Sequence, residues 1–92
     1  MLTMSYELYT KFDSRASFYG KAHVTETDNK LVLCSYSTDV CVIDLKTNKA
    51  KVNSDYSMTT NRHIKEFLKQ NGLKAENTKQ ILKDYLIKEV VL

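Results

Sequence analysis

The residues of this 92-residue chain that could bind a metal through nitrogen or sulfur are two histidines and two cysteines: His23, Cys34, Cys41 and His63. If a tight turn is centred on residues 37–38, Cys34 and Cys41 lie opposite each other on adjacent strands, with Cβ atoms about 4.5–5.5 Å apart. If the preceding turn is centred on residues 28–29, His23 lies opposite Cys34. One row across a sheet face would then carry three of these four residues.

Two interpretations of this row are open. With His63 supplied by a helix packed on the sheet, the four side chains would form a Cys2His2 set, which is a ligand set that zinc prefers. Their spacing matches no zinc-finger pattern, and a cysteine in a central strand is most often a small buried apolar residue. We therefore expect no bound metal and keep the zinc set as the alternative.

No catalytic pattern emerges from the sequence. The two glycines, Gly20 and Gly72, cannot build a glycine-rich phosphate-binding loop. Acidic pairs such as Glu26/Asp28 lie at expected turns or strand edges, where carboxylates are commonly solvated or form the turn. Nothing in the spacing places a base beside a nucleophile. We expect no catalytic residue and no cofactor, and therefore a protein that is not an enzyme.

Basic residues gather on one face of a helix expected within residues 56–72. Arg62, Lys65 and Lys69 are spaced at i, i+3 and i+7, and Glu66 is placed to form an exposed pair with Arg62. Such a face can be simply solvated. It can also contact an anion or a nucleic acid, and tyrosine and arginine are favoured anchors in protein interfaces.

The start of this helix is unusual. Thr59 or Thr60 can serve as the N-cap, and Gly72 stands where a glycine commonly follows a helix. Arg62 and His63 would then occupy the first turn, where the helix dipole disfavours cations. This conflict suggests that they serve a purpose other than helix stability.

The elements that position these residues fall into two groups. Apolar runs separated by turn residues over about residues 4–54 predict four to five antiparallel strands in meander order. The middle two runs are apolar at nearly every position, so both faces of the sheet centre are expected to be covered. Over about residues 58–88 the periodicity becomes helical, with an apolar stripe of Ile64, Phe67 and Leu68.

A second helix is expected to start at Asn77, whose side chain can cap it, with Gln80 three residues later in a capping-box spacing. The predicted fold class is therefore α+β: an antiparallel β-meander of four to five strands followed by a helical hairpin packed on the sheet.

Length and charge limit the alternatives. A chain of 92 residues is expected to form a single domain over residues 1–92. The net charge of +3 is spread over both halves of the chain, which permits nucleic-acid binding without indicating it. The first twelve residues lack an apolar signal segment, and no run suits a membrane helix. We expect an intracellular protein with reduced thiols and no membrane contact, either a monomer or a homodimer.

Residues 56–68 have the pattern Y-S-x-T-T-x-R-H-I-K-E-F-L, which resembles a family of short proteins from phages and mobile elements of Gram-positive bacteria. The likeness extends to "SFYGKA" at residues 17–22 and "LCSYSTDVCVI" at residues 33–43, and it covers roughly residues 6–85. The family has no established activity, so the resemblance transfers no catalytic residue. It implies a small accessory protein that acts by binding.

The expected function is therefore that of a non-enzymatic accessory protein in the cytoplasm of a bacterial host cell. Its expected partner is a host protein or ribonucleoprotein, and its expected action is anti-CRISPR-like inhibition of a nucleic-acid-directed defence system. The alternative is a small DNA- or RNA-binding regulatory protein, and a third possibility is a homodimeric structural module. The candidate contact residues are Tyr56, Thr59, Arg62, His63, Lys65 and Lys69.

Overall fold

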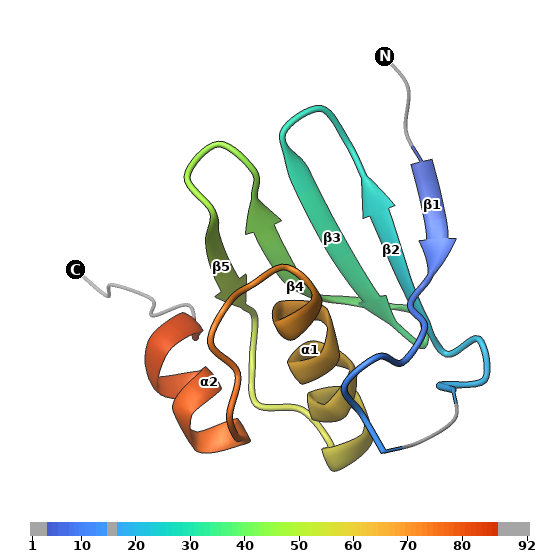
Figure 1. Ribbon diagram of the computed structural model, residues 1–92, viewed down its shortest axis with the longest axis vertical. Coiled ribbons are helices and arrows are strands. Elements are labelled where there is room, and N and C mark those ends of the chain that lie inside the picture. Colours follow the sequence, from blue (N-terminus) through green and yellow to red (C-terminus); the bar gives the residue numbers. More distant parts are fainter. Residues whose placement is uncertain (1–3, 15–16, 87–92) are drawn as a thin grey trace.

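The computed structural model describes residues 4–14 and 17–86, which form one antiparallel sheet and two helices (Figure 1). The strands are β1 (Met4–Glu7), β2 (Ala22–Glu26), β3 (Lys30–Ser35), β4 (Thr38–Asp44) and β5 (Lys49–Val52). They pair in sequence order, each antiparallel to the next. The helices are α1 (Met58–Gln70) and α2 (Thr78–Tyr85). The predicted α+β fold, a β-meander followed by two helices packed on the sheet, is confirmed.

The core lies between the helices and one face of the sheet. In β3, Leu31 and Leu33 are buried whereas Val32 and Cys34 are only half-buried, which is the alternation expected of a sheet with one buried face. The apolar stripe of α1 is fully buried as predicted. Burial of this stripe against the sheet supplies the hydrophobic stabilisation that joins the two parts of the chain.

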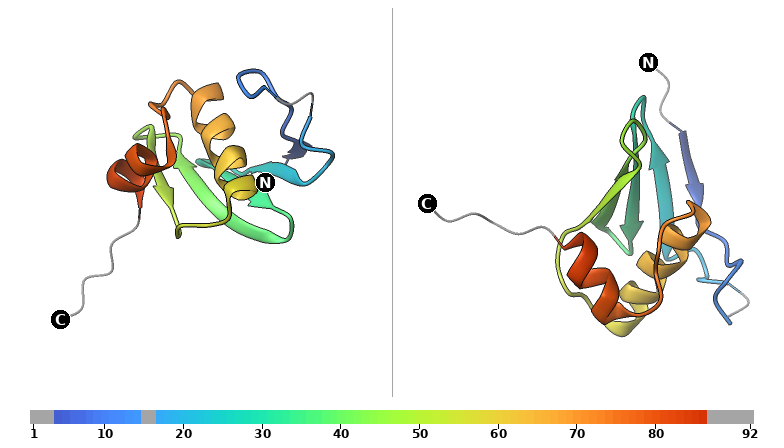
Figure 2. Two further views of the ribbon diagram at one scale, coloured as in Figure 1. Left: turned by 90° about the horizontal axis from the view of Figure 1, so that it is seen from below. Right: turned by 60° about the vertical axis from the view of Figure 1, so that its left-hand side comes forward.

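Within residues 4–14 and 17–86, only one face of the sheet is covered, contrary to the expectation that both faces of the sheet centre are covered. Figure 2 shows α1 and α2 on the same side of the sheet. On the other face, Val32 pairs with Val42, and both remain half-buried rather than enclosed. Their apolar character suggested full burial, but a valine also fits a half-buried strand position through its β-propensity.

The turn between β3 and β4 lies one residue earlier than expected. A two-residue loop, residues 36–37, joins Ser35 to Thr38. The register then shifts between Leu33 and Cys34, so that Cys34 faces Asp39 while Cys41 faces Leu33. A one-residue slip exchanges the faces of a strand, which explains why the predicted pairing of Cys34 with Cys41 is wrong.

Helix α1 begins earlier than the sequence suggested. Its N-cap is Ser57, whose Oγ accepts the backbone N–H of Thr60 at 3.3 Å. The predicted caps, Thr59 and Thr60, lie inside the first turn, which therefore moves Arg62 and His63 into the second turn. The helix dipole acts mainly within the first turn, so the expected conflict at the helix start does not arise.

The end of α1 agrees with the prediction. Gly72 follows the C-cap residue Asn71 and has a φ of 75°. Its backbone N–H donates to the carbonyl of Lys69, and the N–H of Leu73 donates to the carbonyl of Leu68. This pair of bonds is the Schellman arrangement, which favours glycine at the left-handed position.

Helix α2 is capped by Asn77 as predicted, because the Asn77 Oδ1 accepts the N–H of Gln80 at 2.8 Å. In a capping box the Gln80 side chain accepts the backbone N–H of the N-cap residue, Asn77. Here the Gln80 Oε1 accepts the N–H of the preceding residue, Glu76, instead. Helix α2 ends at Tyr85, and the last part of its expected extent, residues 87–88, lies outside the described residues.

Candidate functional site

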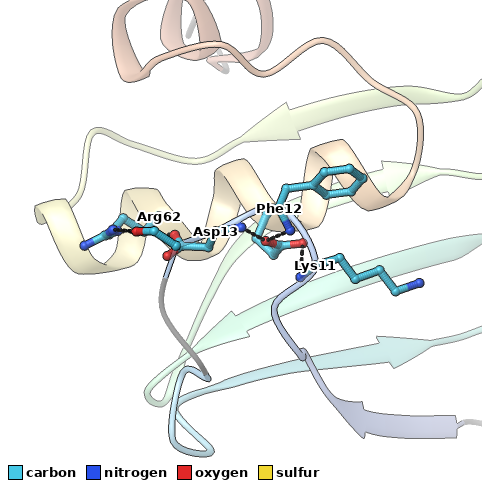
Figure 3. A network of polar contacts seen from close by, with 6 residues as sticks. Lys11, Phe12, Asp13 and Arg62 are labelled. Carbon is cyan, nitrogen blue, oxygen red and sulfur yellow. Dashed lines mark hydrogen bonds and ion pairs between the residues drawn. The ribbon is translucent and has the colours of Figure 1, made fainter.

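The segment after β1 folds along the outer side of α1, where Glu66 holds it. The Glu66 Oε1 accepts the backbone N–H groups of Phe12 and Asp13 at 3.0 and 2.7 Å. Its Oε2 accepts the N–H of Lys11 at 3.1 Å and the side-chain amide of Gln70 at 2.6 Å. Three consecutive backbone donors around one carboxylate form an anion-binding nest that the protein fills with its own side chain (Figure 3).

Glu66 is only 1% exposed. A buried carboxylate is tolerated when its oxygens accept several hydrogen bonds, and Glu66 accepts four. The predicted exposed pair between Arg62 and Glu66 is therefore wrong. Arg62 instead pairs with Asp13, with 3.2 Å between the Arg62 Nε and the Asp13 Oδ2, and its Nη2 donates to the Ser14 hydroxyl (Figure 3).

The fixed segment and the helix enclose a groove of about 280 Å³, which we call the α1 groove. Arg62, Lys65 and Lys69 line it from the helix side, and Phe12, Asp13 and Ser14 line it from the segment. Phe12 is 57% exposed, and the Lys69 Nζ lies 5.9 Å from the centroid of its ring. The predicted basic face thus lines a groove.

His63 is the centre of a second cluster beneath the start of α1. Its Nδ1 lies 2.8 Å from the Ser35 hydroxyl, which also lies 3.0 Å from the Thr60 hydroxyl. The Phe18 ring lies against His63 with ring centroids 4.5 Å apart. All four side chains are buried, so Ser35 and His63 do not face a substrate; they join β3 to α1.

Two exposed tyrosines adjoin this cluster in an unusual backbone conformation. Tyr19 has a φ of 54° and Tyr36 a φ of 59°, and bulky residues rarely adopt such left-handed values. Each such residue costs about 1–3 kcal/mol and persists only where the surrounding structure fixes it. Here Tyr19 is fixed by the bond from its N–H to the Ser17 hydroxyl, and Tyr36 by the bond from its N–H to the Lys21 carbonyl.

Around these tyrosines lies a smaller groove of about 170 Å³, which we call the tyrosine groove. Its lining includes Tyr19, Lys21, Tyr36, Thr59, Arg62 and His63. Arg62 lines both grooves. Three of the stretches that carry the sequence resemblance, residues 17–22, 33–43 and 56–68, contribute side chains to this groove.

The candidate contact residues lie in different surroundings. Arg62, Lys65 and Lys69 lie together in the α1 groove, and Thr59 lies half-buried in the tyrosine groove. His63 contributes to the floor of the tyrosine groove but is 1% exposed. Tyr56 packs against the core and lines neither groove.

The four potential metal ligands do not converge. His23 lies opposite Cys34 as predicted, on the uncovered face of the sheet. Cys41 is fully buried on the core face, and His63 belongs to the cluster with Ser35. Within residues 4–14 and 17–86, no group of three or more His, Cys, Asp or Glu side chains is arranged to hold a metal ion.

Burial also makes both thiols weak nucleophiles. It raises the pKa of the Cys41 thiol to about 12. The pKa of Cys34 is also raised, mainly by burial and further by the charge of Asp39. Because the thiolate is the reactive form, both cysteines are protonated near neutral pH.

Sequence reasoning missed Phe12, Tyr19 and Lys21, which other segments bring to α1. The segment containing Phe12 has no periodic pattern, and its position depends on Glu66, more than fifty residues later. Tyr36 adjoins the expected turn at residues 37–38, where a large exposed ring is uncommon, whereas Tyr19 lies in a stretch with a strand-like pattern that gives no such signal.

The fold is that of a small α+β domain: a five-stranded meander with two helices on one face and a basic, aromatic surface along the first helix. A protein-family model described as a family of unknown function, DUF8033, matches residues 6–84. The chain belongs to this family. No curated protein and no solved structure matches it. Within the described part of the chain, no helix has the length and apolar character needed to span a membrane.

Proposed function

We propose that this protein is a non-enzymatic accessory protein that binds a host macromolecule through the α1 groove. The observation that carries the proposal is the groove itself, in which Arg62, Lys65 and Lys69 share one helix face beside the exposed ring of Phe12. Cations next to an exposed aromatic ring suit a partner that presents acidic or phosphate groups.

The construction of the groove supports a binding role. Four hydrogen bonds to Glu66 hold the segment that carries Phe12 against α1. A surface that is already ordered before binding loses less conformational entropy when a partner arrives. The groove is therefore a better candidate for a contact surface than a solvated helix face of the same composition.

The resemblance to phage and mobile-element proteins suggests the kind of target. Accessory proteins of such elements often bind host machinery, and we propose a nucleic-acid-directed defence complex, such as a CRISPR effector, in the host cytoplasm. Inhibition follows from occlusion, with Arg62 and Lys65 placed against acidic or phosphate-bearing surface on the target.

A plasmid-interference assay tests this proposal. A bacterial host with an active CRISPR system is transformed with a targeted plasmid, with and without expression of this protein. We expect expression to restore transformation. We further expect the Arg62→Ala/Lys65→Ala variant to lose the effect, because both cations are removed from the groove.

The matched control is Lys79→Ala/Lys83→Ala. It removes the same charge from exposed positions of α2 that line neither groove, and it should still protect the plasmid. Failure to protect against any CRISPR system tested would count against the proposed target, and equal loss of protection in both double variants would count against the α1 groove.

A small DNA- or RNA-binding regulatory protein is the second candidate. The observation that favours it is the tyrosine groove, where two exposed aromatic rings adjoin two cations.

A further inference from the structure

The side chains of Tyr19 and Tyr36, which line the tyrosine groove beside the start of α1, are exposed to solvent. Tyr19 is 74% exposed and Tyr36 is 53% exposed, although tyrosine normally contributes to stability by burying its ring. Both occupy left-handed backbone conformations that are rare for bulky residues. Such outliers cluster at functional sites, and more than half of the surface of each of these two residues is open to solvent.

Aromatic rings also make up the floor between them. Phe18 and His63 are in ring contact, and the centroids of Tyr36 and His63 lie 6.0 Å apart. The His63 ring is fixed from below by the Ser35 hydroxyl. Because Phe18 and His63 are themselves buried, the aromatic surface that a flat group could meet in the tyrosine groove is that of Tyr19 and Tyr36.

The charges at the groove are those of a weak anion site. Lys21 and Arg62 line it, and both are cations at neutral pH. Asp13 offsets part of the Arg62 charge through its ion pair, and the Glu7 carboxylate accepts the N–H of Gly20 at the edge of the groove. The groove can hold one or two phosphates, but its main attraction for a ligand is aromatic.

We propose that the tyrosine groove binds single-stranded nucleic acid, with bases stacked on Tyr19 and Tyr36 and the phosphate backbone against Lys21 and Arg62. Aromatic platforms flanked by cations bind single strands with little sequence preference. This inference deepens the proposed function because it names the kind of partner that binds next to the α1 groove. It rests on the proposed function because both assign Arg62 as a contact residue.

The choice of a single strand follows from what the groove offers. In a duplex the base faces are already stacked on one another, so exposed aromatic rings gain little from it, whereas an unpaired strand can turn its bases outward. A volume of about 170 Å³ is also smaller than the roughly 300–1,000 Å³ of sites that enclose a whole small molecule. It suits one flat group of a longer ligand.

Fluorescence anisotropy with the purified full chain tests the proposal. The probes are a short labelled oligothymidylate, the corresponding oligouridylate, and a duplex of the same length. We expect both single strands to bind and the duplex to bind more weakly. With two phosphate contacts, the slope of log affinity against log salt should be about −1.4, so affinity falls about sevenfold between about 50 and about 200 mM salt.

Substitutions at the rings separate stacking from charge. Tyr19→Ala/Tyr36→Ala should weaken single-strand binding by at least about tenfold, whereas Tyr19→Phe/Tyr36→Phe should stay within about twofold because the rings remain. Tyr9→Ala is the control, since Tyr9 is similarly exposed and lines neither groove. Circular dichroism confirms that each variant is folded.

Three results would overturn the proposal: no single-strand binding at the lower salt concentration, equal binding of duplex and single strand, or unchanged binding after Tyr19→Ala/Tyr36→Ala. The assay needs no host factor, so it separates this inference from the proposed function. If the tyrosine substitutions abolish plasmid protection while no oligonucleotide binds, the groove contacts a protein, and only the nucleic-acid inference fails.

Discussion

At the scale of single residues, Glu66 shows how one buried charge positions a whole segment. Its carboxylate accepts the N–H groups of residues 11–13 and the Gln70 amide. The segment lacks regular secondary structure of its own, and these bonds satisfy backbone donors that would otherwise need water or a strand partner. Glu66 thus places Phe12 beside the lysines of α1.

Glu66→Gln should therefore destabilise the protein more than the loss of one surface charge does. The amide would turn a donor toward backbone N–H groups, leaving at least one of them without an acceptor. We expect the free energy of unfolding to fall by about 2–3 kcal/mol, measured by urea denaturation. Glu76→Gln, at an exposed position, is the matched control, and a similar small change in both variants would contradict this account of Glu66.

At the scale of elements, α1 has an apolar face that packs on the sheet and a basic face that lines the α1 groove. Ile64, Phe67 and Leu68 bury one face against the sheet, while the other face carries the cations of the α1 groove. The helix must be held in one rotational setting for this to work. The Ser35–His63–Thr60 cluster provides a polar contact to β3 that only one setting satisfies.

The N-cap of α1 provides a test of where the helix begins. Because the Ser57 Oγ accepts the N–H of Thr60, Ser57→Ala should lower the free energy of unfolding by about 1 kcal/mol. Thr59→Ala changes no cap, and we expect it to stay within about 0.5 kcal/mol of the parent protein. Thermal and urea unfolding measure both changes. A larger effect at Thr59 would instead support the N-cap suggested by the sequence.

At the scale of the whole molecule, the protein is built as one sheet with one covered face. Both helices and the segment after β1 lie on the core side or beside it (Figure 1). The other face carries Val32 and Val42 among polar neighbours. The α1 groove and the tyrosine groove both lie beside α1.

A pair of valines in β4 tests this one-sided architecture. Val40 is 1% exposed, whereas Val42 is half-buried on the open face. Val→Thr replaces a methyl group with a hydroxyl that needs a hydrogen-bond partner when buried. We expect Val40→Thr to cost about 1–3 kcal/mol and Val42→Thr less than about 0.5 kcal/mol, as judged by urea denaturation.

Equal, large losses for the two valine variants would mean that the second face is covered in solution. A homodimer formed through this face would explain such losses. Light scattering of the parent protein would detect that homodimer independently.

The elements were largely predictable because their signals are local. The alternation of apolar residues, the helical stripe of α1, and the glycine and asparagine at helix ends act over a few residues. They predicted the meander, the two helices and the basic face of α1. They failed by two or three residues at the α1 cap and by one residue at the β3–β4 turn, where several small polar residues compete for the same role.

The sequence by itself therefore determined the fold class and the cationic helix face. Only the tertiary structure decided which residues meet there. The face on which each cysteine lies depends on a one-residue register shift, and the burial of Glu66 depends on backbone donors more than fifty residues away. Tyr19 and Tyr36 join Arg62 through pairings between distant segments, which no short-range pattern in the sequence records.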